Sequence, residues 1–328
     1  MSEPHLPPPV FVAPEDFREV VLVEPPRRPY ATHLGLFLLT FLFSLIVGAR
    51  LDENFAKSQP LFINDVKFFA VSSIWKDPKS LLDGLPFAAS LLGILMAHEM
   101  GHFLYALKHR VYSTLPYFIP APTPVGTFGA FILIKSRFRS LASLFDIGMA
   151  GPIGGFVVAV PLALVGLALS KPLPVGSNAA MNLGYPPIFH LLYAVQHGWD
   201  APLETVLLHP VAIAAWIGML ATALNLLPGG QLDGGHIIYS LSPGLHGKIT
   251  RVSMAVLLPL SIFFWPGWLI WVFGLWFTRR HPYVPEYPTL DVARRRVAFL
   301  GLIMFVLSFT PEPFLGGGLY DVFKGLLP

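Results

Sequence analysis

Long runs of apolar residues, separated by short polar segments, are the dominant pattern along the chain. A helix that spans a bilayer needs about 20 consecutive apolar residues, and several of these runs approach or exceed that length. We expect spans at residues 33–49, 85–107, 144–170 and 206–227, a further apolar region at 249–278 and a last run at 297–309. The pattern therefore predicts an all-α polytopic membrane protein with about six to seven transmembrane helices.

The region 249–278 admits two interpretations because Pro266 and Gly267 interrupt it. It is either one long tilted helix or a hairpin of two short helices. Basic residues gather in the cytoplasmic loops of membrane proteins, and only the hairpin leaves the flanking basic residues on one side. Those residues are Lys248, Arg251, Arg279, Arg280, Arg294, Arg295 and Arg296. We therefore favour the hairpin.

The composition also indicates an integral membrane protein rather than a large soluble core. Of the 328 residues, 54% are hydrophobic and 12% are charged, whereas soluble domains carry about 25% charged residues. The mean hydropathy is +0.62. The chain has no cysteine, which excludes disulfides and thiolate ligands, so any metal must be held by nitrogen and oxygen. The net charge of +3 gives no indication of a nucleic-acid partner.

Residues 1–31 are rich in proline and mixed in charge. Such a segment buries too little apolar surface to fold by itself, so we expect a disordered tail and treat 32–328 as the integral membrane domain. Arg27 and Arg28 precede the first span, and by the positive-inside rule they place the tail in the cytoplasm. We favour a plain tether over a partner-binding segment.

Three ionisable side chains lie within the second span, in the sequence His98-Glu99-Met100-Gly101-His102. Ionisable residues at membrane depth are costly and are therefore usually functional. His98 and His102 are four residues apart, so on a helix they share one face and can bind one zinc ion. Glu99 lies beside them and can transfer protons. The alternative, a pair of histidines hydrogen-bonded between helices, is the weaker explanation inside a span.

The same span carries small residues at a spacing of four, namely Gly93, Ala97 and Gly101. Small side chains let a second helix approach closely within a membrane. The third span offers a similar face at Gly151 and Gly155. We therefore expect a neighbouring helix to pack closely beside the two histidines.

A catalytic zinc site has three protein ligands and an open position for water, so a third ligand is needed. The candidates at the cytoplasmic ends of the spans are His109, Asp146, Asp233 and His236. The second and fourth spans both end on that face. Asp233 follows the fourth span in a flexible, glycine-flanked segment, so we favour it. His236 is the runner-up, and Asp146 is better explained as the cap of the third span.

Residues 111–142 do not form a span because Pro116, Pro120, Pro122 and Pro124 break their first half. The run 126–135 is rich in β-branched and aromatic residues, which predicts a short hairpin that dips into the membrane beside the site. The hairpin either pairs with an extended substrate or is an interfacial loop, and both interpretations stay open. In the first case the substrate-binding residues are Gly126, Thr127, Phe128, Gly129, Ala130 and Phe131.

The His98–His102 motif, the sequence Asn225-Leu226-Leu227-Pro228 and the sequence Leu232-Asp233-Gly234 together resemble the site-2 proteases, zinc metalloproteases that cut peptide bonds within membranes. The resemblance covers about residues 85–240, which we take as the catalytic core. It implies that His98, His102 and Asp233 bind Zn²⁺ and that Glu99 activates the zinc-bound water. It also implies that Asn225 holds the substrate or its developing oxyanion. The chain is similar to the minimal branch of the family, without a PDZ or nucleotide-sensing domain.

The function implied by this resemblance is hydrolysis of peptide bonds in transmembrane substrate proteins, with the bilayer as the second partner and no nucleic acid. An inactive protease homologue and a metal transporter are the alternatives. A di-iron membrane oxidase would need more histidine clusters than the one close pair present. We expect a multi-pass protein and favour a bacterial inner (plasma) membrane, with an organelle membrane as the alternative that stays open. Its active site should be nearer the cytoplasmic face, since His102 lies roughly 9 Å from the end of the span at Lys108. Substrate identity and oligomeric state stay open.

Overall fold

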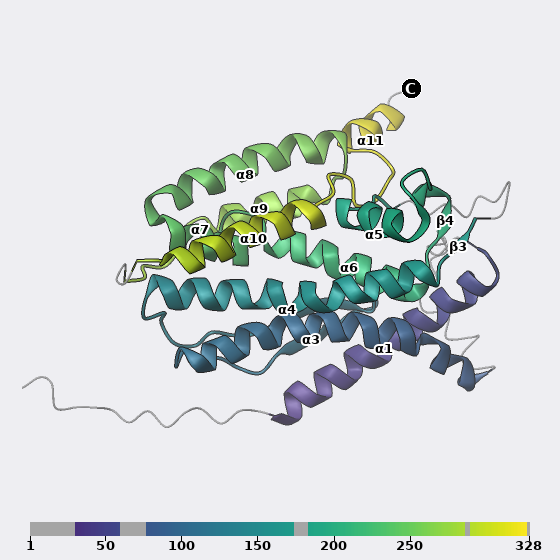
Figure 1. Cartoon of the computed structure of the whole chain (residues 1–328), viewed down its shortest axis with the longest axis horizontal. Helices are drawn as coiled ribbons and strands as arrows, with labels where there is room; N and C mark the ends of the chain where they lie inside the picture. Colours follow the sequence, from purple (N-terminus) through teal and green to yellow (C-terminus); the bar gives the residue numbers. More distant parts are fainter. Residues whose placement is uncertain (1–29, 60–76, 174–182, 286–288, 327–328) are drawn as a thin grey trace, which may run out of the picture.

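The computed structural model describes residues 30–59, 77–173, 183–285 and 289–326, and most of these residues are helical. The main helices run back and forth along one axis of the molecule (Figure 1). They are α1 (Tyr30–Ala56), α3 (Leu85–Lys108), α4 (Leu141–Ala168), α6 (Pro210–Asn225), α8 (Pro243–Phe263), α9 (Trp268–Thr278) and α10 (Val292–Ser308). The predicted tail at 1–31 lies almost wholly outside the described residues.

Shorter elements connect the main helices. The short helices are η2 (Pro78–Gly84), α5 (Pro187–His197), η3 (Leu203–Thr205), α7 (Asp233–Leu241) and α11 (Leu319–Leu326). The strands are β1 (Tyr117–Pro120), β2 (Thr127–Phe131), β3 (Lys171–Pro172) and β4 (Val206–Leu207). β1 pairs with β2, and β3 pairs with β4, both antiparallel.

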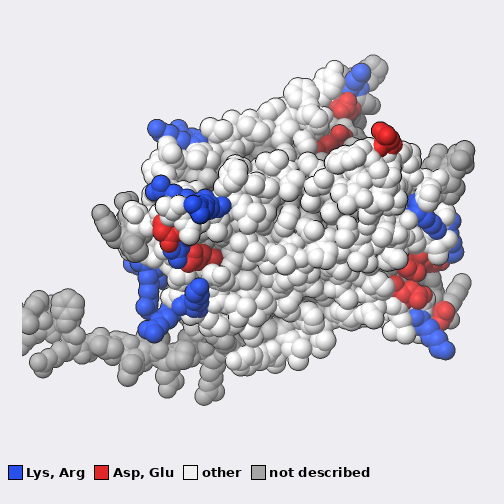
Figure 2. All heavy atoms as spheres, viewed as in Figure 1, with Lys and Arg blue, Asp and Glu red and all other residues white. Residues whose placement is uncertain are grey.

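The surface of the molecule suits a membrane. Among the described residues, three helical segments are long and apolar enough to cross a bilayer, namely Tyr30–Ala56, Pro78–Lys108 and Leu141–Ala168. Figure 2 shows charged side chains gathered towards the ends of the long axis, with a wide uncharged band between them. Large apolar side chains such as Val157 and Phe273 are exposed, as they would be against lipid. The expected membrane character is confirmed, whereas the number of about six to seven spans stays a prediction.

The chain reverses direction between α8 and α9, which lie side by side (Figure 1). Pro266 and Gly267 fall in the break between the two helices, where proline ends the regular hydrogen-bond pattern. Trp268 is buried at the start of α9, and its Nε1 donates a hydrogen bond to the carbonyl oxygen of Pro311 at 2.7 Å. The predicted hairpin is therefore confirmed, and a single tilted helix over 249–278 is wrong.

The predicted β-hairpin lies between α3 and α4. β1 and β2 pair with Tyr117 opposite Phe131. Gly126, just before β2, has a φ of +83°. A Cβ atom at this position would lie 2.7 Å from Cα of Ser44 in α1. Only glycine combines a positive φ with so close an approach to α1, so Gly126 allows the hairpin to pack against this helix.

The backbones of α3 and α4 are in direct contact. A Cβ atom on Gly101 of α3 would collide with the carbonyl oxygen of Ala150, and one on Gly154 of α4 would lie 2.5 Å from that of Ala97. Such an approach is possible only where side chains are absent or small. The prediction of close packing along α3 is therefore confirmed for Ala97 and Gly101. It is wrong for Gly93, which has no neighbouring atom within 4 Å of its Cβ position.

We expect Gly101→Ala to destabilise the protein because the added methyl group forces α3 and α4 apart. Overpacking of this kind costs about 1–3 kcal/mol, which would lower the Tm of the detergent-solubilised protein. Gly93→Ala is the matched control, since it adds the same group to the same helix in open space and should be neutral or stabilising. Equal shifts of the Tm in both variants would contradict the close contact.

Candidate metal centre

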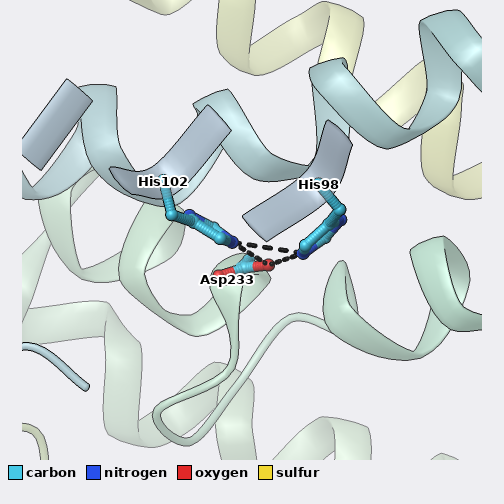
Figure 3. A group of neighbouring side chains, drawn as sticks. All are labelled: His98, His102 and Asp233. Atoms are coloured by element: carbon cyan, nitrogen blue, oxygen red, sulfur yellow. Dashed lines mark hydrogen bonds and ion pairs between the residues drawn. The ribbon is translucent and has the colours of Figure 1, made fainter. Parts of the chain in front are cut away.

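The structure brings together three side chains that could hold a metal. His98 and His102 project from one face of α3, and Asp233 projects from the first turn of α7 (Figure 3). Nε2 of each histidine lies 3.3 Å from Oδ2 of Asp233, and the two Nε2 atoms are 3.1 Å apart. Neighbouring ligands of a tetrahedral zinc ion, with bonds of about 2.0–2.1 Å, are about 3.3 Å apart. The three atoms therefore have the spacing of three corners of such a site.

A main-chain carbonyl of α4 fixes the tautomer of His102. Nδ1 of this ring lies 2.7 Å from the carbonyl oxygen of Ile147, which can only accept a hydrogen bond. The proton is therefore on Nδ1, and Nε2 keeps a lone pair directed at the triad. Metal-bound histidines are usually oriented by a hydrogen bond of this kind on the other ring nitrogen.

Two glycines of α4 leave room for the histidine rings. A Cβ atom at Gly151 would collide with Nε2 of His102, and one at Gly155 would lie 3.2 Å from Cβ of His98. The predicted small-residue face of the third span therefore packs directly against the two rings. The expected close packing of a helix beside the two histidines is therefore present, and the structure adds that Gly151 and Gly155 themselves meet the rings.

The segment between α6 and α7 turns Asp233 back towards α3. α6 ends at Asn225, and Pro228 with the glycines after it stops the helix, as predicted. Gly230 has a φ of +59°. A Cβ atom on Gly234 would collide with the carbonyl oxygen of Leu226. These glycines permit a turn tight enough to place Asp233 at the N-terminus of α7, where a carboxylate is favoured.

Two of the other third-ligand candidates belong to a separate ion-pair network. Nε2 of His109 lies 2.9 Å from Oδ2 of Asp146, and Arg294 donates two hydrogen bonds to the same carboxylate at 2.8 and 2.7 Å. These contacts join the ends of α3, α4 and α10. The prediction that Asp146 caps the third span is wrong, because Ser140 is the N-cap and its side chain accepts from the N–H of Ser143.

A cavity of about 250 Å³ opens beside the triad. Glu99 and Asn225 line it together with His98, His102 and Asp233. Glu99 is buried, and the main-chain N–H of Ile132 faces its carboxylate. Nδ2 of Asn225 lies 3.3 Å from Nε2 of His98. The cavity therefore holds a proton acceptor and an amide donor beside the three candidate ligands.

The predicted substrate-binding segment reaches this cavity only at its C-terminal end. Ala130 and Phe131 line the cavity, whereas Gly126, Thr127, Phe128 and Gly129 are not among its walls. Phe128 is 73% exposed and lies outside the cavity. Ile132 and Ile134 line the cavity and were missed, although they continue the same apolar run.

His236 lies one helical turn after Asp233 and lines the same cavity. Its Nδ1 is 2.8 Å from Nε2 of His281, and it does not belong to the group of close ligand atoms. Burial lowers the pKa of His236 to about 4, so its ring is neutral at pH 7. The geometry therefore favours Asp233 over His236 as the third member of the triad.

Comparison with known proteins gives consistent matches. Residues 86–264 match peptidase family M50. The "probable zinc metalloprotease EGY1, chloroplastic" of Arabidopsis thaliana is 32% identical over 306 residues, which cover 86% of this chain and 53% of that protein. Its namesake in Oryza sativa subsp. japonica is 33% identical over 310 residues, covering 86% and 50%. The "probable zinc metalloprotease EGY2, chloroplastic" of Arabidopsis thaliana is 29% identical over 321 residues, covering 95% and 56%. The chain spans about half the length of these curated relatives.

We expect Gly151→Ala to weaken divalent-metal binding, because the added methyl group displaces the ring of His102 from the triad. Loss of the groups that orient a ligand usually costs about 10–100-fold in metal affinity. Metal retained after dialysis against graded chelator measures the change. Gly93→Ala is again the control. Unchanged affinity in Gly151→Ala would contradict the tight fit of the ring against α4.

Proposed function

The chain belongs to peptidase family M50, the site-2 protease family, and from this premise we propose that it is a zinc metalloprotease that hydrolyses peptide bonds of transmembrane proteins within the bilayer. The observation that carries the proposal is the triangle of His98, His102 and Asp233, with the spacing of three zinc ligands. Relatives that are named as zinc metalloproteases support the metal and the reaction class. The wide uncharged band on the face seen in Figure 2 supports a reaction at membrane depth.

In this proposal His98, His102 and Asp233 would hold Zn²⁺. When bound, the ion would supply a Lewis acid that lowers the pKa of a water towards about 7 and polarises the scissile carbonyl. Glu99 takes a proton from the attacking water and passes it to the leaving amine, so it serves as base and then as acid. Asn225, whose Nδ2 lies 3.3 Å from His98 Nε2, donates a hydrogen bond to the developing oxyanion.

The β-hairpin offers a strand edge to the substrate. A transmembrane helix satisfies its main-chain groups internally, so the substrate must unwind around the scissile bond. Within the described residues β2 pairs with β1 alone. The N–H of Ile132 faces Glu99, and the alternation of an antiparallel strand puts the N–H of Ala130 on the same edge. Main-chain hydrogen bonds to this edge would offset part of the helical bonds that the substrate loses.

The arrangement of the helices supports more crossings than the three longest segments. The main helices α1, α3, α4, α6, α8, α9 and α10 run alternately towards the two ends of the molecule (Figure 1), which supports about six to seven spans. Basic residues lie just outside these helices or within their terminal two turns at the end nearer the metal centre, at Lys108, Arg110, Arg139, Lys248, Arg279, Arg280 and Arg295. The positive-inside rule assigns that end to the cytoplasm or the equivalent compartment.

The predicted bacterial inner membrane has no support from the relatives, which are named as chloroplastic proteins. The proposal is therefore a multi-pass protein with its metal centre nearer the basic face, and it leaves the type of membrane open. It names no substrate protein, because the pocket residues Ala130, Phe131 and Ile132 offer main-chain and apolar contacts to any extended chain.

We expect Glu99→Gln to abolish cleavage of a model transmembrane substrate and to keep zinc. Glutamine has the shape of glutamate but cannot take a proton from water, and loss of a general base typically costs about 10²–10⁴-fold in rate. The assay uses the full chain in liposomes, with product measured by gel and bound zinc by atomic absorption. Cleavage at the wild-type rate would contradict the role of Glu99.

Asp233→Asn is the matched comparison for that experiment, since it also replaces a carboxylate by an amide. It should lose bound zinc together with activity, because the amide removes a charged ligand oxygen. Undiminished zinc in Asp233→Asn would move the third ligand elsewhere, with His236 as the first candidate.

We expect Ala130→Pro to lower the rate of cleavage about five- to tenfold, because proline removes one edge N–H that pairs with the substrate. Ala130→Ser keeps this N–H at the same position and is the control. Zinc content and Tm should be equal in the two variants. Equal cleavage by both would contradict pairing of the substrate with this edge.

A further inference from the structure

Three histidines and a tyrosine form a cluster next to the candidate metal centre. The cluster consists of His236 and Tyr239 on α7, His246 on α8 and His281 after α9. Tyr239 stacks on His281 with ring centroids 3.9 Å apart, and the ring of His246 meets that of His281 edge-on at 5.5 Å. His236 alone of these four lines the cavity that holds the candidate metal ligands. The cluster is therefore connected to the cavity through one ring.

The hydrogen bonds of the cluster determine which nitrogen of His236 carries the proton. Nδ1 of His281 lies 2.7 Å from the carbonyl oxygen of Pro282, so this nitrogen must donate. Burial lowers the pKa of His281, so its ring is neutral and its Nε2 is an acceptor. Nδ1 of His236 lies 2.8 Å from that Nε2 and must therefore donate to it. As a consequence, Nε2 of His236 has a lone pair and no proton.

The ring of His236 is also held in position by its neighbours. A Cβ atom on Gly148 of α4 would lie 3.1 Å from Cβ of His236, so α4 closes one side. The ring of Phe138 packs at 6.0 Å between centroids. Gln231, in the turn that carries Asp233, donates a hydrogen bond to the carbonyl oxygen of Arg280 at 3.1 Å. This bond ties the segment containing His281 to the turn of the metal centre.

Nε2 of His236 is left for a ligand in the cavity. In the part of the chain that the structure describes, the only hydrogen bond found for this ring is the one from Nδ1 to His281. Nε2 does not belong to the metal-binding group, whose three atoms already have the spacing of zinc ligands. A ring that lines the cavity thus carries a fixed, neutral acceptor that neither the metal nor the proton transfer by Glu99 uses. An unfolded peptide supplies donors for such an atom through its main-chain N–H groups.

We propose that His236 is a substrate-binding residue whose Nε2 accepts a hydrogen bond from a main-chain N–H flanking the scissile bond, and that His281 is a positioning residue that holds His236 in the required tautomer. The inference rests on the proposed protease function and deepens it. It assigns to the segment after α9 a part in substrate binding, although that segment is far from both metal-binding motifs in the sequence.

Substitutions that copy one ring nitrogen at a time test the role of His236. Glutamine places an amide near the position of Nε2, whereas asparagine places one near Nδ1. We expect His236→Gln to keep kcat/KM within about threefold, and His236→Asn to lose about tenfold or more. Zinc content and Tm should not change in either variant. His197→Gln, on the exposed face of α5, is the control with unchanged turnover.

The same logic applies to the positioning residue. His281→Gln keeps an acceptor for Nδ1 of His236, whereas His281→Phe keeps only a ring to stack on Tyr239. We expect His281→Phe to lose about as much activity as His236→Asn does. His281→Gln should keep most of the wild-type activity. A purely structural role of the ring would give the opposite order, because phenylalanine preserves the stack.

A substrate series identifies the bonded N–H. Model substrates in which one peptide bond next to the scissile bond is replaced by an ester lack a single N–H. At one position the ester should slow cleavage by the wild type about tenfold but should not slow cleavage by His236→Asn any further. Additive losses at every position would overturn the proposal, as would equal activity of the glutamine and asparagine variants, or loss of zinc in proportion to activity. Absence of Glu99-dependent cleavage by the wild type is a different result, which would overturn the proposed function itself.

Discussion

α3 and α4 lie so close that the carbonyl oxygens of each helix face glycines of the other, and the metal centre depends on this contact. Gly101 and Gly154 permit the approach. It brings the carbonyl of Ile147 to Nδ1 of His102 and leaves just enough space at Gly151 for the ring. Burying an imidazole costs free energy unless its nitrogens are hydrogen-bonded. The bond from Nδ1 of His102 to α4 offsets part of this cost and orients the lone pair of Nε2.

The second part of the centre comes from the broken segment between α6 and α7. A regular helix continued beyond Asn225 would carry Asp233 away from α3, whereas the turn at Pro228–Gly230 returns it to the histidines. His236, one turn later, faces the same cavity and is bonded to His281. One short segment therefore supplies both a candidate metal ligand and a candidate substrate contact. Charged side chains gather towards both ends of the long axis, while the middle of the face seen in Figure 2 stays uncharged.

Much of the helical framework could be predicted because the length of an apolar run is a local property. The span expected at 85–107 is Leu85–Lys108, and the one expected at 144–170 is Leu141–Ala168. The reversal at Pro266–Gly267 follows from the residues themselves. The prediction of close packing along the small residues of α3 was only partly correct. Their spacing shows that a helix can be approached closely, but it does not show where the neighbouring helix crosses. For this reason Gly101 lies in the contact and Gly93 lies outside it.

By itself the sequence determined that His98 and His102 share a face, since the period of the helix decides this, and that Asp233 follows a break in a later span. Only the tertiary structure shows that Asp233, and not His236, joins the two histidines in the group of close ligand atoms, because both residues lie on α7 and line the same cavity. The tertiary structure also determines the tautomer of each ring. Nδ1 of His102 donates to a carbonyl of α4, and Nδ1 of His236 donates to a ring that follows α9. No local sequence pattern brings such distant groups together.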